Sequence, residues 1–174
     1  MPRNSARRSR FQRGQALTEF ALVSIVLALF LAGSIEFGLL YSHKVELANA
    51  ARAGARWAAA HPTSWTAVAS PASNTVEGQV LGAGGTAQVA NDDSHLTIEY
   101  LDSSPATPVL CGRYSVAGAG FAAQPGYTQA TCVVPGSLAR VTVTQSYPLL
   151  TAILGGLFGA AVTVKGTATM PVMA

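Results

Sequence analysis

The sequence predicts an α+β fold in which one long N-terminal helix packs on a small antiparallel β-sheet. Helical periodicity runs without a proline from residue 15 to residue 60, and His61-Pro62 ends it because a residue before proline is pushed out of the helical region. Three later segments, residues 95–101, 138–147 and 160–172, alternate apolar and polar side chains with the period of two that marks half-buried strands. Together they predict a sheet with one face toward water.

The first half of the predicted helix has the length and composition of a membrane span. Residues 20–35 carry no charge and extend about 24 Å, and with residues 15–19 and 36–41 added the segment reaches the roughly 30 Å of a hydrocarbon core. Five arginines precede it, and arginine accumulates on the cytoplasmic side of membranes. The N-terminus is therefore predicted to lie in the cytoplasm, with everything after about residue 42 outside.

The charge balance argues against a nucleic-acid partner. The formal net charge is +3, but five of the eleven Lys and Arg residues lie before Gly14. Without residues 1–14, the chain has six basic and eight acidic residues, and its net charge is −2. The excess of basic residues thus belongs to a targeting signal and not to a binding surface.

The outer half of the helix carries a smooth face of small and apolar residues. Two interpretations remain open for this face: docking on the protein's own sheet, or contact with another subunit. Both remain compatible with the spacing of three and four residues between its members, which are Leu40, Leu47, Ala51, Gly54 and Ala58.

The middle of the chain is less informative. Residues 62–90 are rich in small and polar side chains, with one weak helical stretch at 74–81, and the Pro- and Gly-rich residues 103–136 are predicted to form a long loop. Residues 149–159 are strongly apolar and fit a buried turn, a short core helix or an exposed patch for a partner or the membrane surface.

The two cysteines, Cys111 and Cys132, both lie in the part predicted to be exported. An oxidising compartment permits them to pair, which would tie the 103–136 loop; two free buried thiols are the alternative.

No set of residues predicts catalysis or metal binding. The histidines His43, His61 and His95 have no nucleophile placed near them by a recognisable motif. Asp92, Asp93 and His95 match no known ligand spacing, so a solvated loop before a strand is expected there. We therefore predict no enzyme activity, no cofactor and no metal.

The junction Gly14-Gln15-Ala16-Leu17-Thr18-Glu19-Phe20 resembles the processing site of type IV pilin-like proteins. The Glu-Phe pair, the second acid in Ile35-Glu36-Phe37-Gly38 and the small-residue run at 50–58 resemble TadE-like minor pilins, or pseudopilins, of tight-adherence (Tad, Flp-type) pili. Residues 139–149 and 162–170 fit the same family.

This resemblance implies a pilin-like fold and cleavage by a prepilin peptidase between Gly14 and Gln15. The expected divisions are a basic leader (1–14), a transmembrane helix (15–42) and an extracytoplasmic α+β domain (43–174). It also implies a single-pass protein of the inner, or cytoplasmic, membrane that takes part in the assembly, priming or capping of a Tad pilus, and that either stays at the membrane in an initiation complex or is incorporated in the extracellular pilus. The implied partners are other Tad pilins and minor pilins, an inner-membrane assembly platform and membrane lipid.

Glu19 is the residue with the clearest physical role. A carboxylate on a lipid-facing helix costs on the order of 2.5–3.5 kcal/mol. In the pilin-like family, pairing of this acid with the N-terminal amine of a neighbouring subunit is thought to set axial register. The resemblance implies that role for Glu19 and for the amine of Gln15, with Phe20 as part of the processing site.

Two other interpretations stay open. Leu31-Ala32-Gly33-Ser34 places small residues after a hydrophobic stretch, as in an exported binding domain released by ordinary signal peptidase and unrelated to pili. A membrane-anchored extracytoplasmic domain that is never cut is the third. The mature N-terminus distinguishes them: Gln15, Ile35 or a neighbour, or Met1.

Overall fold

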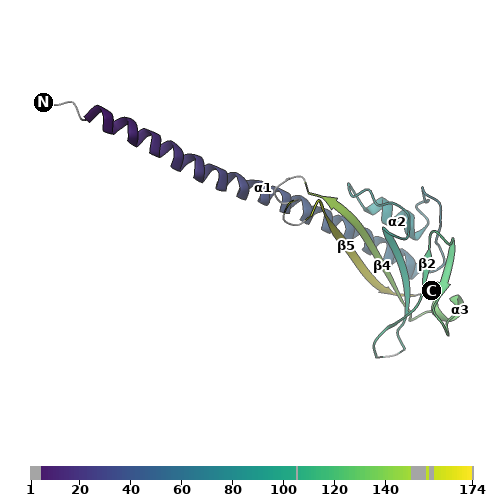
Figure 1. Ribbon diagram of the computed structural model, residues 1–174. Coiled ribbons are helices and arrows are strands. Elements are labelled where there is room, and N and C mark those ends of the chain that lie inside the picture. Colours follow the sequence, from purple (N-terminus) through teal and green to yellow (C-terminus); the bar gives the residue numbers. More distant parts are fainter. Residues whose placement is uncertain (1–4, 105, 150–155, 157–158, 174) are drawn as a thin grey trace.

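The computed structural model describes residues 5–104, 106–149, 156 and 159–173, with side chains from Gln15 onward. One long helix, α1 (Ser5–Ala60), precedes all the other described helices and strands. Figure 1 shows the first half of this helix standing away from everything else, while its second half lies against the sheet. We call the described part of residues 61–173 the head.

α1 begins ten residues earlier than the sequence predicted, so part of the basic leader is helical too. The physical reason is that arginine, alanine and glutamine form helices readily, and no proline stands between Pro2 and Pro62. The end at Ala60 is confirmed, and the N–H of His61 donates to the carbonyl of Trp57 as the last turn closes.

The head contains one five-stranded sheet in which every neighbouring pair is antiparallel. The spatial order is β3-β2-β1-β4-β5. The strands are β1 (Leu96–Asp102), β2 (Val109–Ser115), β3 (Gly120–Ala123), β4 (Leu138–Pro148) and β5 (Ala161–Pro171).

The three predicted strands are confirmed as β1, β4 and β5. They are neighbours in the sheet, with Ile98 opposite Val141 and Val141 opposite Ala168. Along β1, alternate side chains are buried, as the period of two predicted. The α+β fold class is therefore as expected.

The prediction of a single long loop over residues 103–136 was wrong. That segment contains β2, β3 and the short helix α3 (Gln129–Cys132). β2 and β3 extend the sheet beyond β1, because β2 pairs with β1 and β3 with β2. Their signal was weak, since β3 has four residues and β2 carries a glycine, Gly112, where Phe121 packs. The weak helical stretch near residues 74–81 forms α2 (Val76–Ala83).

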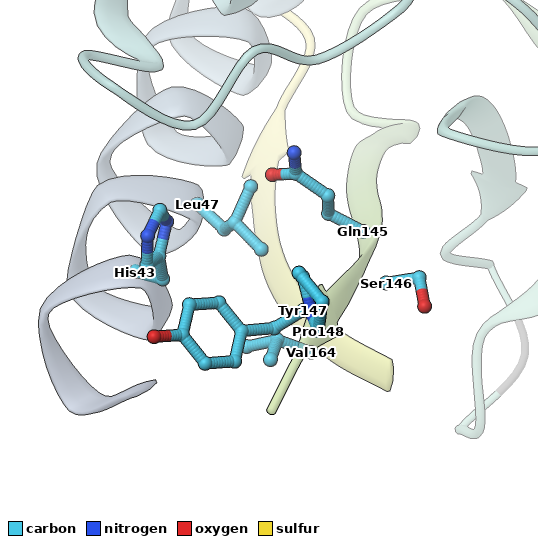
Figure 2. Close-up of a pocket in the computed structure, with 7 residues that line it drawn as sticks. All are labelled: His43, Leu47, Gln145, Ser146, Tyr147, Pro148 and Val164. Atoms are coloured by element: carbon cyan, nitrogen blue, oxygen red, sulfur yellow. The ribbon is translucent and has the colours of Figure 1, made fainter. Parts of the chain in front are cut away.

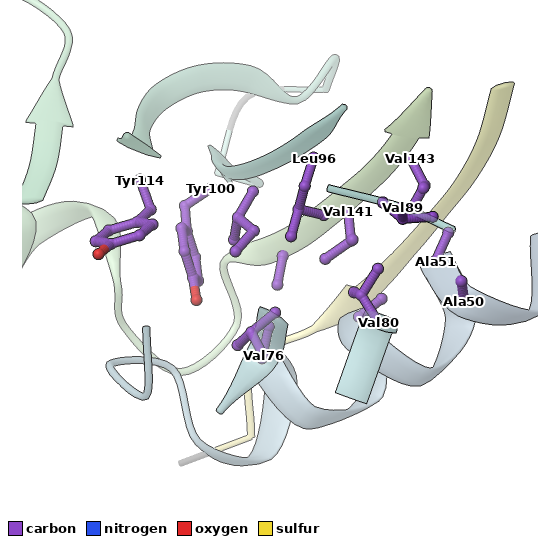
Figure 3. Packing of buried hydrophobic residues seen from close by; sticks show 14 of the residues in the cluster. Ala50, Ala51, Val76, Val80, Val89, Leu96, Tyr100, Tyr114, Val141 and Val143 are labelled. Atoms are coloured by element: carbon purple, nitrogen blue, oxygen red, sulfur yellow. The ribbon is translucent and has the colours of Figure 1, made fainter. Parts of the chain in front are cut away.

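The core lies between the sheet, α2 and the C-terminal half of α1 (Figure 3). The small-residue face of α1 is buried against the sheet, so docking on the protein's own sheet is confirmed for this face. Small residues matter because they let backbones approach closely: a Cβ on Gly166 of β5 would come within 2.5 Å of backbone atoms of Leu47 and Ala48. The α1 residues in this core are Leu47, Ala50, Ala51, Ala55 and Ala58.

Glu77 places a carboxyl group inside this core. It is fully buried at the start of α2; its Oε1 accepts a hydrogen bond from the N–H of Thr66 at 3.0 Å. Its Oε2 has no hydrogen-bond partner among the residues that the structure describes. Burial raises the pKa of Glu77, while the bond from Thr66 acts in the opposite direction.

The raised pKa predicts a pH dependence of stability with a definite sign. A carboxyl that binds its proton more tightly when folded stabilises the protein fully below its unfolded pKa of about 4.3, and this contribution is lost as pH rises through the folded pKa. We expect the free energy of unfolding of the wild type to fall with rising pH above about 4.3 relative to Glu77→Gln, whose side chain does not titrate. Urea unfolding of both proteins at a series of pH values checks this; parallel pH profiles would contradict it.

Candidate functional site: the exposed half of the long helix and its junction with the head

The N-terminal half of α1 presents an almost continuous apolar surface. Nearly all side chains over residues 15–35 are exposed, including large ones such as Leu17, Phe20 and Phe30. Within the described residues, one helical segment, Gln15–Ala60, is long and apolar enough to cross a membrane, with a mean hydropathy of 2.3 in its most apolar window. A soluble domain rarely leaves so large an apolar surface uncovered, and this half of α1 is consistent with a membrane anchor.

The predicted processing residues lie in one continuous stretch of this helix. Gly14 lies within α1, so the Gly14–Gln15 bond is in helical backbone. Gln15, Glu19 and Phe20 are all exposed. The side-chain amide of Gln15 donates to Oε1 of Glu19 at 3.2 Å, one helical turn away. The structure thus brings Gln15 and Glu19 together within one chain and leaves the carboxylate accessible to a neighbour.

The junction between α1 and the head contains a cavity of about 190 Å³. Figure 2 shows the rings of His43 and Tyr147 next to each other between α1 and β4, with centroids 4.9 Å apart. Burial raises the pKa of Tyr147, and the charge of Glu36 raises it further. The remaining lining residues are Leu47, Gln145, Ser146, Pro148 and Val164.

The sequence placed Glu36 at the outer end of the apolar span and left its role open, and the structure buries it to 4% exposure beside this junction. The apolar residues 149–159, for which three interpretations were open, lie almost entirely outside the described residues. Buried acids such as Glu36 and Glu77 give no sequence signal of their own, because burial depends on what the fold packs over them.

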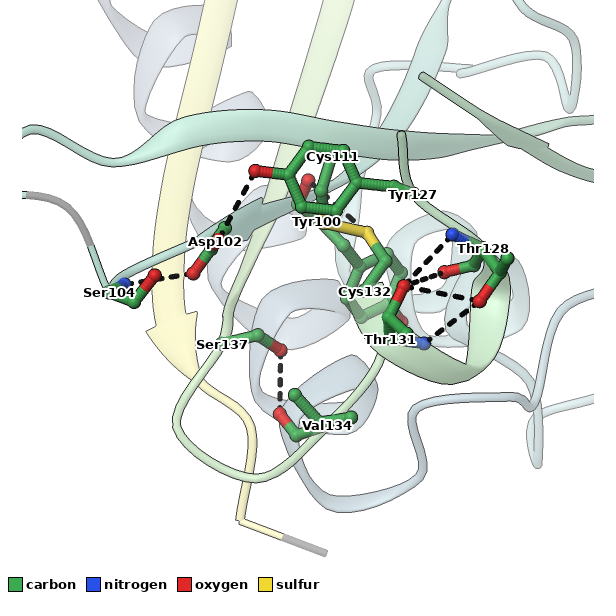
Figure 4. The surroundings of a disulfide bond; sticks show 10 residues. All are labelled: Tyr100, Asp102, Ser104, Cys111, Tyr127, Thr128, Thr131, Cys132, Val134 and Ser137. Atoms are coloured by element: carbon green, nitrogen blue, oxygen red, sulfur yellow. Dashed lines mark hydrogen bonds between the residues drawn. A yellow bond between two sulfur atoms is a disulfide. The ribbon is translucent and has the colours of Figure 1, made fainter. Parts of the chain in front are cut away.

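The disulfide predicted between Cys111 and Cys132 is present, with the two Cα atoms 5.6 Å apart. It joins β2 to the end of α3, beside Tyr100 (Figure 4). Thr128 caps α3, accepting from the N–H of Thr131 while the Thr131 hydroxyl accepts from the N–H of Thr128. With a sequence separation of 21 between the cysteines, the cross-link stabilises the head by about 3 kcal/mol in the chain-entropy model.

Asp92 and Asp93 accept hydrogen bonds that fix the loops around them. Asp92 accepts hydrogen bonds from Ser94 and His95. Burial acts to raise the pKa of Asp92, but these bonds outweigh it and hold the pKa at about 2. Asp93 instead accepts from the Ser115 hydroxyl and the following backbone N–H groups. Over the described part of the chain, no group of three His, Cys, Asp or Glu side chains is arranged to hold a metal ion.

The three histidines lie apart in separate structural contacts. His43 is at the junction, His61 stacks on Trp57 with ring centroids 4.2 Å apart, and His95 lies 2.8 Å from Asp92. Each thus packs or bonds locally. The absence of enzyme activity remains a prediction.

Comparison with known protein families gives a match within α1, over its apolar half and most of the half that packs on the sheet. Residues 14–56 match the family model of TadE-like protein. This part of the chain is TadE-like, as the motifs around Gly14 and Glu36 indicated. No curated protein and no solved structure matches the chain significantly. The TadE-like match covers α1 but not the sheet, and it supports a protein associated with Tad pili.

Proposed function

We propose that this protein is a minor pilin or pseudopilin that takes part in the assembly, priming or capping of a Tad-type pilus after a prepilin peptidase cuts between Gly14 and Gln15. The observation that carries the proposal is that the TadE-like match starts at residue 14 and follows α1 through its exposed apolar half into the docked half. Because the family model covers this helix and not the sheet, the helix is the part of the chain that the family shares. Exposed apolar helices associate with one another.

The local structure around Gly14 fits cleavage. A peptidase must bind its substrate as an extended chain, so the helix has to open at the scissile bond. Glycine is about 1 kcal/mol less favourable than alanine within a helix, which makes Gly14 the easiest point of opening between Ser5 and Gly33. Removal of the leader takes away five arginines and leaves a new ammonium group on Gln15, four residues before Glu19.

The topology follows from the same residues. The arginine-rich leader holds the N-terminus in the cytoplasm, α1 crosses the inner membrane once, and the disulfide-bonded head lies outside. In this arrangement the partners are other Tad pilins and minor pilins, which surround the apolar half of α1, and the assembly platform at its cytoplasmic end. The head then lies outside the membrane and, after assembly, on the pilus.

The mature N-terminus tests this function. Gly14→Leu should block maturation and leave the full chain, because the peptidase is expected to require a small residue at the cut. Gly33→Leu is the matched control, since nothing lies within 4 Å of a Cβ there and it should mature normally. Intact mass of protein from cells that contain the Tad machinery gives the answer.

The same pair of variants separates the competing functions. A released binding domain predicts a different result: both variants would be cut and begin at Ile35 or a neighbour, since Gly33 is the middle residue of Ala32-Gly33-Ser34, where an A-x-A-like site tolerates any side chain. A protein that keeps Met1 or its immediate neighbours in the wild type would be an uncut membrane anchor. Either outcome would contradict the proposal that this protein is a pilin.

A further inference from the structure

A groove of about 490 Å³ opens between α1 and the first residues of β5, where α1 leaves the sheet. It is distinct from the cavity on the β4 side, although Val164 contributes to both. Its lining residues include Phe37, Tyr41 and Lys44 from α1, and Thr163 and Lys165 from β5. Apolar, hydroxyl and ammonium groups therefore meet in one concave surface.

The groove is basic. Lys44 and Lys165 are the only lysines of the chain, and both line it, whereas none of its lining residues is acidic. The two acids of α1 nearest in sequence to Lys44 are not among the residues that line the groove. Glu36 is buried and its charge acts on Tyr147 of the other cavity, while Glu46 accepts hydrogen bonds from the loop that precedes β1. The groove thus presents a surplus of positive charge to whatever enters it.

The groove also lies at the depth of lipid headgroups if α1 spans the membrane as proposed above. A hydrocarbon core of roughly 30 Å takes about 20 helical residues, so a span that begins at Phe20 ends near Leu39. Lys44 is then about 7 Å further out, within the headgroup layer. Phe37 and Tyr41 are 69% and 60% exposed and occupy the boundary where aromatic residues anchor membrane helices.

We propose that this groove binds the headgroup of an anionic phospholipid from the outer leaflet of the membrane that α1 crosses. Lys44 and Lys165 hold the phosphate from two sides, the hydroxyls of Tyr41 and Thr163 supply hydrogen bonds, and Phe37 lies along the start of an acyl chain. Because the two lysines come from α1 and β5, the lipid links the helix to the edge of the sheet. It therefore holds the head against the membrane surface until the subunit leaves the bilayer. This inference rests on the membrane placement in the proposed function.

The test uses the full chain in phosphatidylcholine vesicles with a trace of spin-labelled phosphatidylglycerol or spin-labelled phosphatidylcholine. Electron spin resonance then gives the relative association of the two labelled lipids with the protein. We expect the wild type to prefer phosphatidylglycerol by roughly fivefold or more, since one basic side chain near an anionic lipid contributes about a fivefold change. Lys44→Gln/Lys165→Gln should reduce the preference to about one, and Lys44→Arg/Lys165→Arg should retain it.

Arg52→Gln/Arg56→Gln is the matched control. It removes the same charge from exposed positions of α1 that lie two to three turns beyond Lys44 and outside the groove, and it should keep the preference. If the control loses the preference for phosphatidylglycerol to the same extent, the preference comes from general surface charge and the proposed site is wrong. Circular dichroism establishes whether each variant is folded. The arginine variant keeps the charge and tests the site even if the glutamine variant unfolds, because a folded arginine variant without the preference also overturns it.

The outcomes also separate this inference from the function on which it rests. A chain that inserts in the vesicles but shows no lipid preference contradicts the groove alone. One that does not insert contradicts the membrane placement, and the groove with it. If the glutamine variant keeps its lipid preference but no longer co-purifies with other pilins, the groove takes an acidic group of a partner protein, and the lipid proposal is wrong.

Discussion

Glu19→Ala is expected to insert in the membrane and to be cleaved at Gly14, yet to be lost from the pilus or its initiation complex, with incorporation reduced at least about tenfold. The carboxylate of Glu19 is exposed on the apolar half of α1, and its partner within the chain is the neutral amide of Gln15. Without a cation nearby, a charge on a lipid-facing helix costs up to about 2.5–3.5 kcal/mol, the value at the bilayer centre, so alanine eases insertion of the isolated helix. In the proposed assembly the ammonium group of a neighbouring Gln15 would offset that cost, and alanine would remove this attraction.

Glu19→Gln separates charge from shape. Glutamine keeps the size and hydrogen bonding of the side chain but cannot attract an ammonium group, so it should behave like alanine. Ser24→Ala is the control, because the Ser24 hydroxyl is exposed on the same half of α1 and bonds only within its own helix, to the carbonyl of Ala21. The measurement is co-purification of each cleaved variant with the other pilins. If both Glu19 variants co-purify as well as wild type does, the carboxylate has no role between subunits.

Gly166→Val should cause the largest loss of stability, by about 3 kcal/mol or more, at the upper end of the usual cost of overpacking. A Cβ at this position of β5 would lie 2.3 Å from the carbonyl carbon of Leu47 and 2.5 Å from the amide nitrogen of Ala48. Both are backbone atoms of α1, which cannot rotate away as a side chain does. The strand and the helix must separate, which opens the core where β5 docks on α1.

Gly82→Ala is the matched control for that substitution. Gly82 lies inside α2, nothing lies within 4 Å of a Cβ there, and alanine is favoured over glycine in a helix by about 1 kcal/mol. It should therefore stabilise the head slightly. Urea unfolding followed by the fluorescence of Trp57 and Trp65 compares the variants; an unchanged midpoint for Gly166→Val would contradict the close helix–strand packing.

Several elements of the fold were predictable because their cause is local. The end of α1 follows from His61-Pro62, since proline excludes the helical conformation before it. The strands β1, β4 and β5 follow from alternation, because one face of each is buried. The cysteine pair followed from the predicted export of residues 111 and 132.

The candidate site likewise has one part that local sequence predicted and one part that it did not. The TadE-like motif from Gly14 to Phe20 was visible in the sequence, because its chemistry sits in one stretch of chain. The groove was not, since Lys44 and Lys165 are 121 residues apart and only the docking of β5 on α1 brings them to one surface. Their rarity was the one available signal, as these are the only lysines of the chain.

By itself, then, the sequence determined the class of fold and the apolar span, because each depends on neighbouring residues and on their contact with water or lipid; the orientation of the span and the processing site remain predictions from the sequence. The tertiary structure decided which face of α1 docks on the sheet, that residues 103–136 add β2 and β3, and that Glu36 and Glu77 are buried. These features depend on contacts between distant segments, whose free energy no local pattern records. Gly166 shows the difference: in the sequence it is a break in a strand pattern, and in the structure it is the point where the strand touches the backbone of α1.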